Sequence, residues 1–145
     1  MENANLVKWV DAYSVGIPVI DKQHKELVKM TNDLFLGCER TELTVVYFMK
    51  AIQKAVNYSK IHFATEEKYM LKVNYPEYEA HKKEHTAFVT EVLNQIKLFE
   101  QGKTAPLSFA LFLKNWLLNH IAISDKKYSS YLIPIADQIV STEIG

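Results

Sequence analysis

The chain has 145 residues, 48% of them hydrophobic, with four glycines and four prolines; this fits one domain and favours long helices over many turns. Lysine plus arginine and aspartate plus glutamate both number 17, so no positive excess can neutralise nucleic-acid phosphates and we expect no nucleic-acid partner. Without a run of about 18 apolar residues or an apolar signal core, and with a lone Cys38, we expect a cytoplasmic protein without membrane insertion.

The first half of the chain predicts an arm and two long helices. Residues 1–17 show no sustained period and are expected to form an irregular arm. A helix is predicted over residues 18–37, because proline is accepted in a first turn and glycine favours a helix C-terminus. A second helix is predicted from Thr41 or Thr44, which are candidate N-caps, to about Val73.

The second half predicts two further long helices. Residues 74–76 break the pattern, because the residue before a proline is pushed out of the helical region. Helices are then predicted over residues 76–101 and 106–123, and Pro134 interrupts a shorter C-terminal helical stretch. Short connections imply antiparallel neighbours, so the expected fold class is all-α. We expect an up-down-up-down antiparallel four-helix bundle forming one domain over residues 1–145.

All five histidines fall on the predicted inward helix faces. A bundle helix turns apolar residues at spacings of three and four toward the core, and these stripes are interrupted by histidines and a glutamate. His62 with Glu66, and His81 with His85, are four residues apart, so each pair shares one face. The carboxylate five residues after His120 fits a straight face less well, but it falls near the expected helix end. The seven candidate ligands are His24, His62, Glu66, His81, His85, His120 and Asp125.

A lone inward histidine is more often a hydrogen-bonded core residue than a metal ligand. Leaving this many buried polar groups without partners would cost about 1–3 kcal/mol each, a sum comparable to the stability of a whole domain. Five imidazoles and two carboxylates exceed the needs of one ion. Nitrogen and oxygen ligands without thiolates indicate iron, manganese, zinc or copper. Two metal ions are therefore predicted, and the Glu-x-x-His motifs of ferritin-like sites are absent from the sequence.

Four motifs surround the candidate ligands. They are Asp21-Lys22-Gln23-His24, His62-Phe63-Ala64-Thr65-Glu66-Glu67, His81-x3-His85, and Trp116-Leu117-Leu118-Asn119-His120 followed by Asp125 and Tyr128. Together with Trp9 and residues 13–17, this set resembles the hemerythrin family, and within it the bacteriohemerythrin branch, over nearly the whole chain. The resemblance implies a four-helix bundle holding two iron ions in a non-heme di-iron centre with an oxo or hydroxo bridge.

The resemblance also implies a role for each ligand. His81, His85 and His120 would hold one iron, His24 and His62 the other, and Glu66 and Asp125 would bridge the two. The iron with two histidines would keep an open site for dioxygen. The residues matching the family's apolar dioxygen pocket are Trp116, Leu117 and Ile121, and Tyr128 matches a tyrosine near the site. Candidate hydrogen-bond partners for the outer imidazole nitrogens are Gln23, Glu67 and Asn119.

The implied function is reversible dioxygen binding for carriage, storage or delivery, without enzymatic turnover. A di-iron peroxidase or oxidase is one alternative, opposed by the lack of an inward acid–base residue beyond the ligands. A sensor domain for oxygen or redox state is another; family members with that role are usually fused to signalling domains, for which this chain has no room. Dioxygen is the expected partner, and an oxygen-accepting protein is left open.

Overall fold

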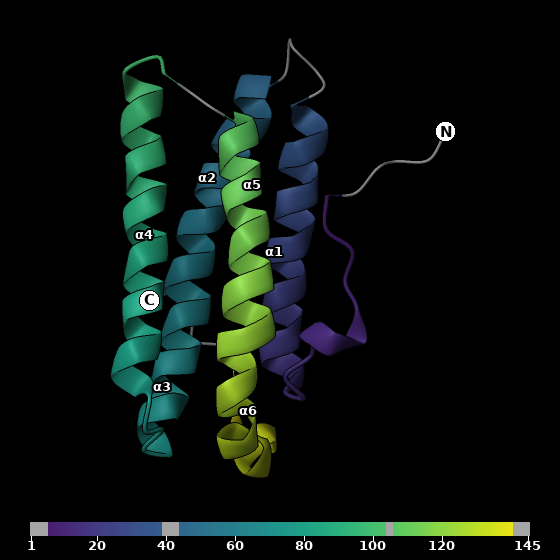
Figure 1. The fold of residues 1–145 in the computed structure, drawn as a ribbon, viewed down its shortest axis with the longest axis vertical. Coiled ribbons are helices and arrows are strands. Elements are labelled where there is room, and N and C mark those ends of the chain that lie inside the picture. The colour runs from purple at the N-terminus through teal and green to yellow at the C-terminus, as the bar shows by residue number, and fades with distance from the viewer. Residues whose placement is uncertain (1–5, 39–43, 104–105, 141–145) are drawn as a thin grey trace.

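Four helical rods stand side by side in the computed structural model, which describes residues 6–38, 44–103 and 106–140 (Figure 1). Consecutive rods run in opposite directions, which confirms the all-α, up-down-up-down bundle. The rods are α1 (Pro18–Gly37); α2 (Thr44–Tyr58), a first π segment (Ser59–Phe63) and α3 (Ala64–Lys72); α4 (Tyr78–Glu100); and α5 (Pro106–Trp116), a second π segment (Leu117–Asp125) and α6 (Lys126–Leu132).

Most helix ends lie at or near the predicted positions. Helix α1 has the predicted bounds, and α2 begins at Thr44, whereas Thr41 lies outside the described residues. Asn74 has a φ of 54°, in the left-handed region, so the second rod ends before it. Gly102 has a φ of 71°, which closes α4 in the way glycine commonly ends a helix.

The fourth rod is longer than the sequence predicted. It does not end near Ile123, because the second π segment continues through Asp125 and passes without a break into α6. The predicted short C-terminal helix is therefore a continuation of the fourth rod. Pro134 lies after it, in a 3-10 turn over Ile133–Gln138. The π segments themselves, one in each of two rods, were not predicted.

The apolar core is divided into two parts by a polar layer. One hydrophobic cluster contains Leu27, Phe88 and Ile121, and the other contains Ile20 and Tyr128. In α1, His24 lies between Ile20 of one cluster and Leu27 of the other. The other candidate ligands lie at the same height along the bundle as His24, each on its own rod. The bundle therefore holds its buried polar residues at one level, with apolar packing on both sides.

The N-terminal arm lies along α1, as Figure 1 shows. Asp21 accepts hydrogen bonds from the Ser14 hydroxyl at 2.5 Å and from the Val15 amide at 2.8 Å. Val7 exchanges two backbone hydrogen bonds with the Asn32 side chain. Over its described residues, 6–17, the arm is irregular as predicted, apart from a 3-10 turn over Asp11–Tyr13. Among the described residues, no helix combines the length and hydropathy needed to cross a bilayer.

Candidate metal centre

All seven predicted ligands meet in the polar layer, and each is at most 3% exposed. Their ligand atoms form two groups in which all atoms lie within 4.8 Å of one another. The first group is Glu66, His81, His85, His120 and Asp125; the second is His24, His62, Glu66 and Asp125. Two carboxylates belong to both groups, so they stand between three histidines on one side and two on the other.

Every rod contributes to the cluster. Three of the rods place at least one ligand on an α-helix, and the two π segments place the rest. His24 comes from α1, His62 from the first π segment, Glu66 from α3, His81 and His85 from α4, and His120 and Asp125 from the second π segment. The clustered side chains are thus held in place by packing of the whole bundle, not by one loop.

Asp125 divides its two oxygens between the two histidine groups. Oδ1 lies 2.9 Å from the Nε2 atoms of both His81 and His120. Oδ2 lies 2.9 Å from His24 Nε2, which belongs to the other group. A carboxylate with one oxygen toward each group has the arrangement of a ligand that bridges two metal ions.

Glu66 also lies between the two histidine groups. Its Oε1 is 3.1 Å from both His62 Nε2 and His85 Nε2, one from each group. Its Oε2 is 4.0 Å from His24 Nε2 and accepts a hydrogen bond from the Tyr128 hydroxyl. The Tyr128 hydroxyl therefore holds Glu66 Oε2 in a fixed position.

These distances match the spacing of atoms around a shared cation. Metal–ligand bonds of about 2.1 Å place neighbouring ligand atoms of an octahedron about 3 Å apart and opposite ones about 4 Å apart. The nitrogens His24 Nε2 and His62 Nε2 are 2.9 Å apart, a contact in which at most one can donate. His81 Nε2, His120 Nε2 and both Asp125 oxygens are buried without a well-oriented hydrogen bond among the described residues. Because such atoms are costly to bury unsatisfied, the residues fit metal ions.

Two of the three predicted outer hydrogen bonds are confirmed. His62 Nδ1 donates to Gln23 Oε1 at 2.6 Å, and His85 Nδ1 donates to Glu67 Oε2 at 2.8 Å. Bonds of this kind fix the ring orientation and leave Nε2 facing the cluster. Asn119 was a wrong prediction: its side chain is exposed and its amide donates to the Asn115 carbonyl at 3.0 Å.

Glu84, which the sequence did not predict, supplies the hydrogen-bond acceptor for a third histidine of the cluster. Its Oε1 accepts from His120 Nδ1 at 3.1 Å and from the Ser124 hydroxyl at 2.8 Å. Sequence reasoning missed it because a glutamate that is 41% exposed resembles any solvated helix residue. The available signal was its spacing, three residues after His81 and hence on nearly the same face of α4.

Burial and ion pairing shift the pKa values of the clustered residues in opposite directions. Burial lowers the pKa of His62 to about 4 and keeps the ring neutral. Burial alone would also lower the pKa of His81 and His120, but the Asp125 and Glu66 carboxylates raise them to about 10 and about 9. Although burial opposes ionisation, the surrounding histidines hold the pKa of Asp125 below its usual range. Without a metal, protons on the imidazoles balance the carboxylates.

Aromatic rings pack directly on the candidate ligands. Trp116 stacks on His120 with ring centroids 4.0 Å apart, and Phe63 stacks on His85 at 3.9 Å. Leu117 and Ile121 are 1% and 0% exposed and belong to the same apolar cluster as Trp116. Their assignment to a dioxygen pocket stays a prediction, whereas their burial beside the centre is observed.

The family is shown by comparison with known proteins. The profile of the family described as "Hemerythrin HHE cation binding domain" matches residues 15–132. Since this is most of the sequence, the chain belongs to the hemerythrin family. The matched range includes all seven residues of the cluster, and the family's cation binding agrees with the donor atoms gathered here.

Curated relatives and solved structures agree. The chain is 33% identical over 124 residues to a bacteriohemerythrin of Stenotrophomonas maltophilia and 36% identical over 125 residues to one of Pseudomonas aeruginosa, each time covering 86% of this chain and 80% of the relative. A hemerythrin-like protein of Naegleria gruberi is 31% identical over 86% of this chain and 92% of its own length. A crystal structure of wild-type hemerythrin matches with a TM-score of 0.74 and 29% identity, over 88% of this chain and 98% of that one.

Proposed function

We propose that this protein binds dioxygen reversibly at a non-heme di-iron centre held by the seven clustered residues. The observation that carries the proposal is the pair of carboxylates shared between a group of three histidines and a group of two. The choice of iron is supported by the imidazole-rich donor set, because iron is among the metals that bind nitrogen and oxygen ligands. The naming of relatives as bacteriohemerythrins supports the same choice.

The unequal histidine groups give the two irons different roles. His81, His85 and His120, together with both carboxylates, would hold one ion. His24 and His62, with the same carboxylates, would hold the other ion and supply one histidine fewer, which would leave room there for a diatomic ligand. Two ferrous ions, when bound, would supply the two electrons that reversible dioxygen binding needs.

The residues of the chain support binding without turnover. The outer hydrogen bonds from Gln23, Glu67 and Glu84 hold three imidazoles in fixed orientations, so the centre keeps its geometry through oxygenation. The two buried phenols nearest the cluster, Tyr58 and Tyr128, keep their protons, because burial and the carboxylate charges raise the pKa of each well above its ordinary value. Neither phenol is therefore suited to proton transfer near neutral pH, which favours a carrier over an enzyme.

The experiment is a visible spectrum combined with metal analysis. Protein purified after expression with sufficient iron is expected to contain two irons per chain. After anaerobic reduction, air should produce a visible absorption band that disappears when the oxygen is removed. A reproducible content near one iron, preference for zinc, or a spectrum that air changes irreversibly would contradict the proposal.

A further inference from the structure

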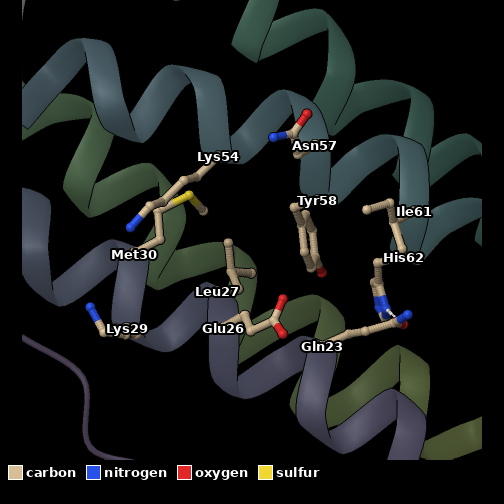
Figure 2. A pocket seen from close by; sticks show the side chains of 10 residues that line it. All are labelled: Gln23, Glu26, Leu27, Lys29, Met30, Lys54, Asn57, Tyr58, Ile61 and His62. Carbon is tan, nitrogen blue, oxygen red and sulfur yellow. Dashed lines mark hydrogen bonds between the residues drawn. The ribbon is translucent and has the colours of Figure 1, made fainter. Parts of the chain in front are cut away.

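The candidate centre has no direct access to solvent, because each of its seven residues is at most 3% exposed. A small ligand must therefore cross part of the protein to reach it. A cavity of about 410 Å³ lies between α1 and α2, and Figure 2 shows the side chains that line it. His62, one of the clustered residues, forms part of its wall, next to Gln23. Two further cavities, of about 300 and 250 Å³, are lined by no residue of the cluster.

The lining of this cavity changes from exposed to buried residues along its depth. Glu26 on α1 and Asn57 on α2 are exposed, whereas Leu27, Tyr58 and His62 are buried. The cavity therefore extends from the surface to the side of the cluster that has two histidines. That is the side on which the proposed function leaves an open coordination position.

Tyr58 lines the buried end of the cavity, beside His62. Its ring stacks on His62 at a centroid distance of 4.8 Å and an interplanar angle of 22°. Its hydroxyl accepts a hydrogen bond from Trp116 Nε1 at 3.3 Å. In Figure 2 the Tyr58 side chain extends between the helices toward Gln23 and His62. Tyr58 therefore contacts both His62 in the cavity wall and Trp116 in the apolar cluster beside the centre.

The cavity mouth carries little net charge. Asp33 lies 2.8 Å from the Lys29 ammonium and 3.9 Å from that of Lys54, both of which line the cavity. Glu26 adds a second carboxylate, so two positive charges face two negative ones. The charges at the mouth therefore present no electrostatic barrier to an uncharged molecule, and long-range attraction of ions is weak. A water molecule takes about 30 Å³ in the liquid, so the cavity holds ligands of two or three atoms with room to move.

We infer that the α1–α2 cavity is the access site of the centre, where dioxygen and other ligands of two or three atoms are held before passing Tyr58 to the side of His24 and His62. The inference rests on the proposed function for the identity of the natural ligand. The route itself is a property of the cavity, and it applies equally to azide. A residue on the route contacts the ligand only in transit. Narrowing the route raises a barrier common to binding and release, so both rates fall by the same factor and the affinity stays constant.

The test is to close the mouth from either helix. Glu26→Trp and Asn57→Trp add a large ring at the rim, without touching a clustered residue. Each variant should slow dioxygen binding to the reduced protein, dioxygen release, and azide binding to the oxidised protein, by about tenfold for each 1.4 kcal/mol added to the barrier. Glu26→Gln keeps the size and removes the charge. Lys22→Trp places the same ring one turn away on α1, outside the cavity. Lys22→Trp should behave as the unmodified protein, and Glu26→Gln should keep the unmodified rates of dioxygen binding and release, because dioxygen carries no charge.

A second readout does not depend on oxygen chemistry. A crystal of the iron-loaded protein under xenon pressure should show xenon in the cavity between α1 and α2, and the Glu26→Trp crystal should not. Unchanged rates in both rim variants, a changed affinity at unchanged binding rates, or a cavity without xenon would each overturn the inference. If the reduced protein takes up no dioxygen at all, the proposed function fails, while azide kinetics and xenon still decide whether this is the route.

Discussion

His120 Nε2 lies 2.9 Å from Asp125 Oδ1, although the two residues are five positions apart in the sequence. In a straight α-helix, five residues turn through about 500°, so the two side chains would point about 140° apart. The π segment over Leu117–Asp125 has the wider turn in which residues five apart share a face. This local departure from α-helical geometry brings the second carboxylate into the cluster, and π segments are frequent at functional sites.

Removing this carboxylate should cost the protein its second metal. Asp125→Ala is expected to contain fewer than two irons per chain, because one oxygen of Asp125 faces each histidine group. Metal analysis of the purified, folded variant measures this. Asp137→Ala, which changes an exposed carboxylate, is the control and should retain full iron. Two firmly held irons in the Asp125 variant would mean that this residue is not a bridging ligand.

The sequence predicted the parts of the centre that follow regular helical spacing. His62 with Glu66, and His81 with His85, are four residues apart, and inward placement of all five histidines needed only an amphipathic pattern. The two π segments could not be predicted, because widening a turn by one residue leaves no change in hydrophobic period that a short window detects. For the same reason the fourth rod was predicted to end near Ile123.

Partners of the ligands were harder to predict than the ligands. Gln23 and Glu67 are adjacent in sequence to ligand residues, so the motif itself pointed to them. Glu84 and Asn119 are also adjacent to candidate ligands, but only Glu84 reaches a neighbouring rod, where it bonds His120, 36 positions away. Gln23 and Glu67 likewise bond histidines of a neighbouring rod, 39 and 18 positions away, whereas the Asn119 amide donates within its own rod. Whether a side chain on a helix edge reaches a neighbouring rod depends on the angle at which the rods pack, which the sequence does not state.

Loss of the Glu84 carboxylate should weaken metal binding while leaving the fold intact. Glu84→Ala removes the acceptor of His120 Nδ1, and losses of such outer hydrogen bonds typically reduce metal affinity about 10- to 100-fold. Iron release to a chelator, followed spectroscopically, should be faster. Glu84→Gln retains an acceptor oxygen and should recover part of the affinity. Glu79→Ala, on the exposed face of α4, is the matched control. Equal release rates in all four proteins would show that Glu84 has no positioning role.

The two irons should respond differently to loss of one ligand. Because only two histidines belong to the second group, His24→Ala should weaken or remove the iron of that group, and with it azide binding to the oxidised protein. Iron content and the azide difference spectrum measure both effects. A variant with two irons and a normal azide complex would show that His24 is not a ligand and that the open position lies elsewhere.

Stability of the metal-free protein should fall on both sides of a maximum near pH 6.5. Folding raises the pKa of His81 from 6.5 to about 10. The stabilisation that its protonated form contributes is therefore complete below pH 6.5 and is lost as pH rises through about 10. The stabilisation contributed by protonated His120, whose pKa is raised to about 9, is lost in the same way as pH rises through that value. The pKa of His62 falls to about 4, so its contribution is lost as pH falls from 6.5 to about 4.

Urea unfolding of the metal-free protein at several pH values measures this dependence. The midpoint should decrease between about pH 7 and about pH 10, and His81→Asn should flatten that decrease because it removes one of the two groups responsible. A midpoint that is constant or rises over this interval would show that the carboxylates do not hold protons on these imidazoles in the metal-free state.

The last prediction concerns water at the centre and tests whether Leu117 acts on the chemistry or only on packing. Leu117 is 1% exposed, opens the second π segment, and lies three residues before His120. A large apolar side chain there keeps water from the centre, and air oxidation of the reduced iron requires a proton that water supplies. Leu117→Ala should therefore retain two irons and reversible oxygenation, but oxidise several-fold faster, with further acceleration by azide.

Truncation of this buried leucine should also cost roughly 2–5 kcal/mol of stability, so iron content and folding must be confirmed before the rates are compared. Leu113→Ala is the matched control, because Leu113 is equally buried in the same cluster one turn further from His120. It should lose similar stability and oxidise at the unmodified rate. Equal oxidation rates in the two variants would mean that Leu117 is an ordinary core residue, and that other side chains keep water from the iron.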